Sequence, residues 1–248
     1  MLTKPKKLGA LALVVMVSFG MLLAALGAAT QFTPATPGAS VARTHLSTAA
    51  SGPAAVNLGS ASTYAAIAYA SITNTGTTAL TGDIGISPGS ALTGFPPGTY
   101  SGTKNVANSA AATAMADVTT AYNDAAGRTT GAVTVAGNLG GQTLTPGLYK
   151  STSSLSISSG DLTLSGAGVY IFQMTSGFST TSGRAVILSN GATAGSVFWQ
   201  VGSTATIGTT STVQGIIIAY ASVTLNTGAQ LNGAAFARTG DVTLASAT

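Results

Sequence analysis

The side chains that could do chemistry in this sequence are mainly hydroxyls, and they recur at a fixed spacing near the C-terminus. Within residues 203–238 a second copy of the pattern begins eighteen positions after the first, so that Thr206 matches Thr224 and Gly215 matches Gly233. Threonine is β-branched, which restricts its χ1 torsion, and it carries a methyl group beside its hydroxyl. Such side chains, held at a regular spacing, would anchor an ordered layer of water.

The ionisable side chains form no catalytic pattern. Charged residues make up 6% of the chain, and neither glutamate nor cysteine occurs. Polysaccharide lyases and glycosidases need paired carboxylates or a basic catalytic group in a groove. The single histidine, His45, lies before the folded region, and the five aspartates are scattered along the chain: Asp83, Asp117, Asp124, Asp161 and Asp241. We therefore expect no enzyme, no cofactor and no metal site.

Three of these aspartates are predicted to have structural roles. Asp124 and Arg128 are four positions apart, a spacing that favours an ion pair at a helix end. Asp83 and Asp161 lie in turn-like segments, where an aspartate side chain accepts hydrogen bonds from nearby backbone N–H groups. We expect these carboxylates to stabilise local structure.

The charge distribution argues against a nucleic-acid partner. The formal net charge is +4, but four basic residues precede residue 55: Lys4, Lys6, Lys7 and Arg43. Beyond that point five basic residues balance five aspartates, so the remaining chain is neutral. A neutral body without a basic stripe lacks the electrostatic footprint that phosphate backbones require.

The N-terminal residues have the composition of a leader and a linker. Residues 1–29 combine a basic start, an apolar run from Leu8 to Leu26 and small residues, as in a secretory signal peptide. The apolar run is long, so an uncleaved membrane anchor is the alternative. Residues 30–54 are rich in Pro, Ser, Thr and Ala and predict a flexible linker. We expect a secreted protein without a membrane contact after cleavage, or a cell-surface protein if the leader is retained.

The pattern of residues 55–248 predicts a mostly β domain. Short runs alternate small polar and aliphatic residues with a period of two, separated by turn residues, which predicts strands. Residues 104–126 differ, because they are rich in alanine and end before Gly127, so they predict one long helix. Its larger apolar side chains would share one face: Met115, Val118 and Tyr122.

The eighteen-residue repeat fits one coil of a β-solenoid with three short strands per coil. In the two copies strand one is 203–207 or 221–225, strand two 212–215 or 230–233, and strand three 215–220 or 233–238. Strand three is apolar on both sides, so its outer face needs the helix as a cover. Strand two points long amides outward, whereas strand one points short hydroxyls outward.

The aromatic pair of residues Phe198 and Trp199 also lies in a strand-three segment, 197–201. We expect both to pack in the core and against the helix, with a carbohydrate-stacking platform as the alternative.

The hydroxyls of strand one also have an interpretation without a special function, because Ser and Thr are common outward residues on any strand. Periodicity alone favours that interpretation.

Several motifs together resemble one family, the microbial ice-binding (antifreeze) proteins. They are "VNLGSASTYAAIAYASI" (56–72), "TGDIGISPG" (81–89), "TAYNDAAGR" (120–128), "GNLGGQTLTPGLYK" (137–150), "VFWQVGSTATIG" (197–208) and "LNGAAFARTGDVTL" (231–244). The resemblance implies a right-handed, three-sided, discontinuous β-solenoid with one long helix alongside. It also implies that one flat face binds ice without catalysis or a cofactor.

The resemblance places ice binding on strand one of each coil. The family's short Thr-Ala/Gly-x-Thr/Asn-like strands correspond to residues 203–206, 221–224 and 239–243, where Asp241 departs from the pattern. The expected ice-binding residues are Thr204, Thr206, Ser222, Thr224 and Thr243, continued in earlier coils by Ser154, Ser156, Gly177 and Ser179.

The partner that this implies is an ice crystal surface. We expect a monomer with no small-molecule substrate. The alternative is a non-catalytic adhesin or matrix protein on the same scaffold.

Overall fold

The computed structural model describes residues 52–248. The predicted signal peptide (1–29), His45 and all of the predicted linker before residue 52 lie outside the described residues. From residue 52 onward the chain is mostly β with one α-helix, α2 (Ser109–Gly127). Two short 3-10 helices, η1 (Gly59–Thr63) and η2 (Ala194–Ser196), complete the helical content of this part. The predicted class is therefore confirmed.

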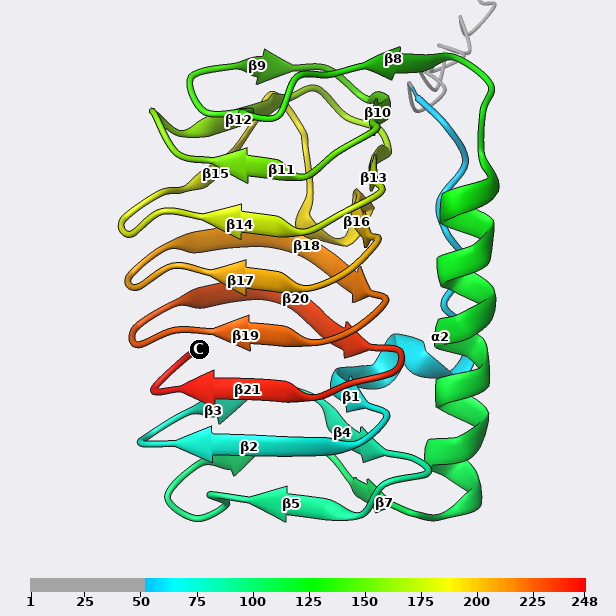
Figure 1. The fold of residues 1–248 in the computed structure, drawn as a ribbon, viewed down its shortest axis with the longest axis vertical. Helices are drawn as coiled ribbons and strands as arrows, with labels where there is room; N and C mark the ends of the chain where they lie inside the picture. The colour runs from blue at the N-terminus through cyan, green and yellow to red at the C-terminus, as the bar shows by residue number, and fades with distance from the viewer. Residues whose placement is uncertain (1–51) are drawn as a thin grey trace, which may run out of the picture. The chain divides into compact units, whose positions relative to one another are not determined.

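The strands wind into a three-sided β-solenoid whose faces are parallel sheets (Figure 1). The first face is a nine-stranded sheet with the order β7 (Lys104–Val106), β4 (Asp83–Ile86), β1 (Tyr64–Ala68), β20 (Gln230–Ala237), β18 (Thr212–Ala219), β16 (Val197–Val201), β13 (Tyr170–Met174), β10 (Gly147–Ser151) and β8 (Ala132–Thr134).

The second face is a seven-stranded sheet with the order β11 (Leu155–Ile157), β14 (Phe178–Thr180), β17 (Ala205–Ile207), β19 (Val223–Leu225), β21 (Val242–Ala245), β2 (Ser71–Thr75) and β5 (Ala91–Thr93). The third face contains two smaller sheets. One has the order β15 (Val186–Ser189), β12 (Leu162–Ser165) and β9 (Thr143–Leu144), and the other pairs β3 (Ala79–Leu80) with β6 (Thr99–Tyr100).

The winding is discontinuous. The N-terminal strands stack beyond the C-terminal coil, since β1 pairs with β20 and β2 pairs with β21. In register, Thr73 lies opposite Thr243. Figure 1 shows the last coil between the β17–β19 coils and the β2–β5 coils. The two ends of the described chain thus build one continuous sheet.

Strands two and three of the repeat are not separate, which corrects one expectation. In both copies they form one strand of eight residues, β18 and β20, paired without interruption from Thr212 opposite Gln230 to Ala219 opposite Ala237. The chain turns the corner at Gly215, whose φ of +111° suits glycine. A Cβ on Gly233 would collide with the carbonyl oxygen of Gly215. Two stacked glycines therefore form the corner between the two predicted strands.

The interior of the solenoid is filled by aliphatic side chains and one aromatic stack. Ring centroids of Tyr149 and Phe172 are 5.3 Å apart, those of Phe172 and Trp199 4.2 Å, and those of Trp199 and Phe178 4.5 Å. Trp199 is fully buried in this stack, and Phe198 is buried on the opposite side of its strand against α2. Core and helix packing are confirmed, and the alternative of a carbohydrate platform on these two rings is wrong.

Helix α2 covers the outer side of the nine-stranded sheet, as the apolar strands predict (Figure 1). Its buried face is Ala111, Ala114, Met115, Val118, Ala121 and Ala125, with Tyr122 partly buried beside it. These side chains pack on sheet residues that include Phe198, Ile216, Ile218 and Phe236. The small alanines let the helix lie close to the sheet.

The helix begins later than the predicted residue 104. Lys104–Val106 instead form β7, which pairs with β4 and closes the nine-stranded sheet. The helix starts after Asn108, whose side-chain oxygen accepts a hydrogen bond from the backbone N–H of Ala111 at 2.9 Å. Asparagine is among the preferred N-cap residues, so this cap sets the boundary. Alanine composition alone does not reveal that preceding residues are used in a sheet.

Candidate functional site

The seven-stranded sheet carries a continuous row of hydroxyl side chains, one per strand. In register from β11 to β5 the row is Ser156, Ser179, Thr206, Thr224, Thr243, Thr73 and Thr93. On the five strands from β11 to β21, both neighbours of each of these residues are buried. The hydroxyl residue must therefore point outward, because side chains alternate along a strand. We call this row the central row.

A second row lies two residues earlier on each coil, and we call it the upstream row. It consists of Ser154, Gly177, Thr204, Ser222, Asp241, Ser71 and Ala91. Backbone hydrogen bonds keep this row in step: Phe178 N–H donates to the Thr204 carbonyl, and Ala205 N–H donates to the Ser222 carbonyl. All members are short side chains.

All nine residues that the sequence proposes for ice binding lie in these two rows on one face. Five of the nine are in the central row, and the other four are in the upstream row. The sequence interpretation missed Thr73 and Thr93 in the central row. Both belong to N-terminal strands outside the eighteen-residue repeat. The alternation of "SITNT" (71–75), with Ile72 and Asn74 buried, is the signal that could have found Thr73.

The two rows define a regular grid. Neighbouring strands in a sheet lie about 4.7–4.9 Å apart, and residues i and i+2 on a strand about 6.5–7 Å apart. Each central residue of the inner strands lies between two hydrogen-bonded neighbours, and β-branching restricts χ1 of the five threonines. The positions of hydroxyl and methyl groups over this face are therefore closely fixed.

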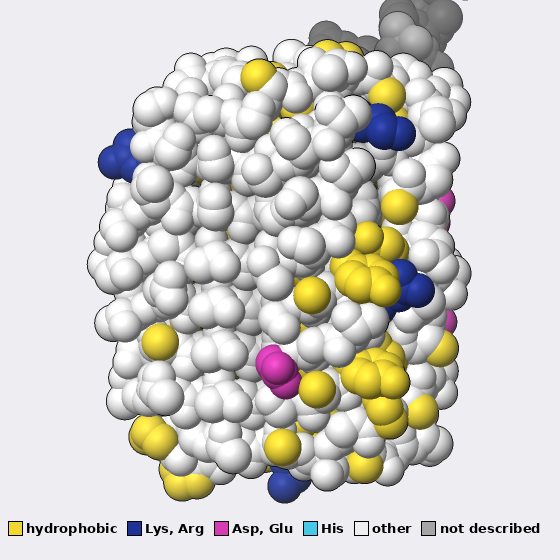
Figure 2. All heavy atoms as spheres, in the orientation of Figure 1, with side chains coloured by type: hydrophobic (Ala, Val, Ile, Leu, Met, Phe, Trp, Pro, Cys, Tyr) yellow, Lys and Arg dark blue, Asp and Glu magenta, His cyan; other side chains and the backbone are white. Residues whose placement is uncertain are grey.

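The face is nearly free of charge. Figure 2, viewed onto this sheet, shows mostly white surface, which is backbone and side chains that are neither hydrophobic nor charged, and one acidic group near the middle. Lys and Arg side chains lie toward the edges of the view, and hydrophobic side chains gather along the edge nearest α2. The acidic residue of the rows is Asp241. Its carboxylate accepts a hydrogen bond from the Ser71 hydroxyl at 2.6 Å, and its backbone N–H donates to the Ser222 hydroxyl at 3.1 Å. The carboxylate is thus held by the adjacent coil.

The other two faces offer no comparable surface. The nine-stranded sheet is covered by α2 over the strands from β7 to β13. On the third face the exposed side chains of β20 include the long amides of Gln230 and Asn232, and Asn232 donates to the Gln214 side chain at 2.9 Å. Long amides adopt several rotamers and hold water less regularly. Short, stiff hydroxyls are concentrated on the seven-stranded sheet.

Two aspartates join neighbouring parts of the fold rather than bonding locally. Asp83 accepts hydrogen bonds from the Thr63 hydroxyl and the Thr103 backbone N–H, both at 2.6 Å, and these bonds lower the pKa of its carboxyl. Asp161 accepts from the Ala185 backbone N–H at 3.0 Å and lies 3.5 Å from the Arg184 guanidinium. The prediction of local turn bonding is wrong for both, because the partners lie on adjacent coils.

The remaining two aspartates are also engaged. Asp117 accepts from the backbone N–H of Ser60 at 2.7 Å and from its hydroxyl at 2.6 Å, and these bonds lower the pKa of the carboxyl. Asp124 forms the predicted ion pair with Arg128 at 2.6 Å. Within residues 52–248 no group of three His, Cys, Asp or Glu residues could hold a metal ion. In the same residues no helix is both long and apolar enough to span a membrane.

Residues 66–248 match the family model described as Ice-binding-like. The chain is 40% identical over 192 residues to an ice-binding protein of Nostoc sp. strain HG1, covering 75% of this chain and 71% of that protein. It is 38% identical over 216 residues to one of Leucosporidium sp. strain AY30, covering 78% and 82%.

Solved structures give the same result. An ice-binding protein from an Antarctic biological consortium superposes with a TM-score of 0.77 at 50% identity, covering 79% of this chain and 90% of that one. One from the ascomycete Antarctomyces psychrotrophicus has a TM-score of 0.74 at 38% identity, covering 79% and 97%. By sequence and by fold, this chain belongs to the Ice-binding-like family.

Proposed function

We propose that this protein adsorbs to ice through the central and upstream rows and thereby inhibits ice growth and recrystallisation. The observation that carries the proposal is the unbroken series of seven hydroxyl side chains, one on every strand of the uncovered seven-stranded sheet. Family membership supports it, since the related proteins are named as ice-binding proteins.

The physical mechanism follows from the regularity of the grid. Ice presents oxygen atoms at regular spacings comparable with the spacings between strands and between alternate residues. Hydroxyl groups anchor water over the face, while the methyl groups of threonine limit competing hydration. A water layer ordered in this way can merge with the ice lattice. Because the side chains are already fixed, adsorption requires little further loss of conformational entropy.

The proposal does not include catalysis. Each of the five aspartates of the chain has a hydrogen-bonded or ionic partner, and these partners tie coils, the helix and η1 together. The single histidine of the chain is residue 45, before the solenoid. No carboxylate pair or nucleophile–base pair is available in the described residues, so a surface-adsorption function fits better than hydrolysis.

The test is a steric block on the proposed face. Thr224→Tyr should leave the fold intact, because Thr224 points outward, but should lift an ice plane off the face. We expect the freezing-point depression to fall by roughly tenfold, as for loss of a well-packed contact at the centre of an interface. The measurement is the gap between melting and freezing temperatures of single ice crystals at fixed protein concentration.

The matched control is Gln230→Tyr on the third face, which should retain the activity. Gln230 is exposed, and it lies at the start of β20, the strand that follows Thr224 and β19 along the chain. Loss of activity in Gln230→Tyr together with full activity in Thr224→Tyr would show that the proposed assignment of ice binding to the seven-stranded sheet is wrong. A purified protein without any effect on ice growth or recrystallisation would instead favour the adhesin or matrix function.

A further inference from the structure

A groove that ice binding does not use lies beside the C-terminal half of α2. It has a volume of about 390 Å³, and clefts that hold small molecules span roughly 300–1,000 Å³. Helix residue Tyr122 forms one wall, and the other lining residues come from the ends of β10, β13 and β16 and the segment after β18. At this corner the chain turns from the nine-stranded to the seven-stranded sheet.

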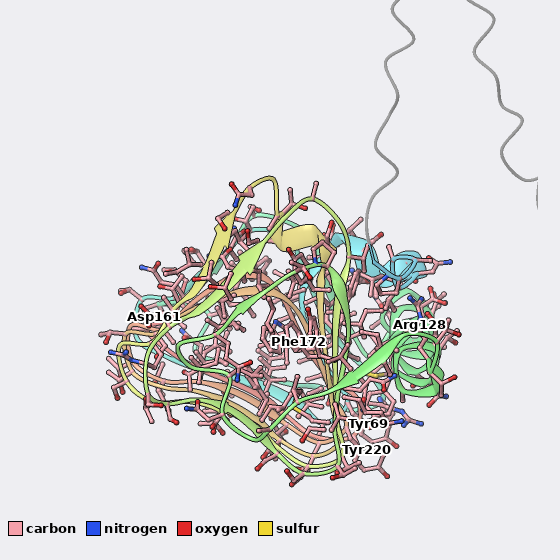
Figure 3. The ribbon with its side chains drawn as sticks, turned by 90° about the horizontal axis from the view of Figure 1, so that it is seen from above. Tyr69, Arg128, Asp161, Phe172 and Tyr220 are labelled. Carbon is pink, nitrogen blue, oxygen red and sulfur yellow. The ribbon has the colours of Figure 1, made fainter. Side chains whose placement is uncertain are left out.

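Two tyrosines form an aromatic wall of this groove. The ring centroids of Tyr122 and Tyr220 are 6.2 Å apart, with an angle of 55° between the rings. Tyr220 is 45% exposed although it is a large ring, and Figure 3 shows it at the outer corner of the solenoid. Tyrosine rings offer an apolar surface together with a polar hydroxyl, which suits the C–H face of a sugar ring.

The floor of the groove carries two buried amides. Gln173 and Gln200 lie opposite each other on β13 and β16 and are 3% and 5% exposed. The Gln173 amide nitrogen donates to the backbone carbonyls of Ala125 and of Arg128, the latter at 2.8 Å, and this fixes the orientation of the amide. Its Oε1 atom is buried and has no donor within the described residues. A buried acceptor without a donor is unfavourable, and a ligand hydroxyl is a suitable donor.

The groove also has a positive edge. Lys150 lines it, directly opposite Gln173 on the adjacent strand β10. The Arg238 guanidinium carbon lies 5.0 Å from the Tyr122 centroid and 5.4 Å from the Tyr220 centroid. Neither cation forms an ion pair within residues 52–248, where the ion pairs are Arg128–Asp124 and Arg184–Asp161. A neutral domain thus places two cations without carboxylate partners beside an aromatic wall and buried amides.

We propose that this groove binds an acidic polysaccharide of the uronic-acid class. A sugar ring packs against Tyr122 and Tyr220 with its carboxylate near Arg238, and hydroxyls of the glycan bond to the amides of Gln173 and Gln200. The carboxylate of a further sugar along the glycan lies near Lys150, because β10 is four strands away from β20, which Arg238 directly follows. A neutral glycan would leave both cations without a carboxylate partner. Two cations are too few for a nucleic acid, whose binding requires a basic stripe along the backbone. The groove lies at the corner beside the seven-stranded sheet, and its lining includes no residue of the central or upstream row.

The test titrates the full chain with an alginate hexasaccharide and, separately, with maltohexaose as a neutral probe of equal length. Calorimetry at low ionic strength should show binding of the alginate probe and at least about tenfold weaker binding of maltohexaose, and added salt should weaken the former. Tyr220→Ala and Lys150→Gln should each reduce alginate affinity by about tenfold. Thr224→Tyr, on the seven-stranded sheet, should bind alginate with the affinity of the unmodified chain.

Three results would overturn the proposal: no binding of alginate to the full chain, equal binding of both probes, or unchanged affinity in Lys150→Gln. Tyr220 and Lys150 are not buried, so thermal melting should be unchanged in both variants. If Tyr220→Ala unfolds, the alginate affinity of Lys150→Gln alone tests the proposal. The freezing-point depression is measured on the same samples. Its absence would contradict the proposed function of the seven-stranded sheet and would leave the proposal for the groove unaffected.

Discussion

At the scale of single residues, the choice of hydroxyl side chain determines how well the water layer is defined. Five of the seven residues in the central row are threonine, and the two serines, Ser156 and Ser179, stand together at the β11 end of the sheet. Serine lacks the methyl group and has a freer χ1 than threonine. We therefore expect the water layer to be better ordered over the five strands from β17 to β5.

Asp241 is the residue on this face that departs from the neutral pattern. A carboxylate holds its own hydration shell and competes with the ordered water layer. We predict that Asp241→Asn increases the freezing-point depression by roughly twofold, because the amide removes the charge and keeps an oxygen that accepts from the Ser71 hydroxyl. The measurement is the melting–freezing gap at equal protein concentration.

Asp161→Asn is the control for this prediction. Asp161 lies on the corner at the far side of the molecule from Arg128 (Figure 3), and it likewise accepts a hydrogen bond from the next coil. Its neutralisation removes one negative charge without changing the central or upstream rows. Equal gains in both variants would mean that net charge, and not the local face, controls activity.

At the scale of elements, the repeat predicts much of the architecture because each coil contacts its neighbours through the same positions. The hydroxyl strands at 205–207 and 223–225, the apolar strand three and the covering helix all follow from alternation and from the need to bury a second apolar face. Gly215 is different. Whether a glycine ends a strand or bends a continuous one depends on the partner strand, and the sequence pattern does not contain that information.

The helix start shows a similar limit, and it yields a stability prediction. Asn108→Ala removes the side-chain acceptor for the Ala111 N–H, and loss of such a cap typically costs about 1 kcal/mol. We expect a lower free energy of unfolding by that amount, measured by denaturant titration. Asn123→Ala, an exposed change near the C-terminal end of the helix, should be neutral or slightly stabilising, since alanine has the higher helix propensity. Equal losses in both would argue against a role of the cap.

At the scale of the whole molecule, the predicted leader bears on where the protein would meet ice. The basic start, the apolar run from Leu8 to Leu26 and the small residues at Ala28 and Ala29 predict export and cleavage. We expect mass spectrometry of protein recovered from the culture medium to give a mature N-terminus near residue 29 or 30. Protein that keeps the apolar run and stays with the membrane fraction would identify the segment as an anchor.

The discontinuous winding is the feature that the sequence pattern could least reveal. Ser71 and Asp241 are hydrogen-bonded although they are 170 residues apart, and pairing over such a separation leaves no local period. It also makes the proposed ice-binding face a property of the whole chain, because β2 and β5 extend the sheet that the C-terminal repeat begins. Residues outside the repeat should therefore matter for ice binding as much as those within it.

Thr73 provides the test of that statement. It lies directly opposite Thr243 and Thr93 in the central row, with Ile72 and Asn74 buried on either side, so its side chain points outward. We predict that Thr73→Tyr lowers the freezing-point depression by roughly tenfold, as Thr224→Tyr does, since a raised ring at either place separates the same plane of ice from the rows. Thr99→Tyr, an exposed change on β6 of the third face in the same N-terminal part, should retain full activity. Full activity in Thr73→Tyr would restrict ice binding to the C-terminal coils and leave β2 and β5 as structural strands only.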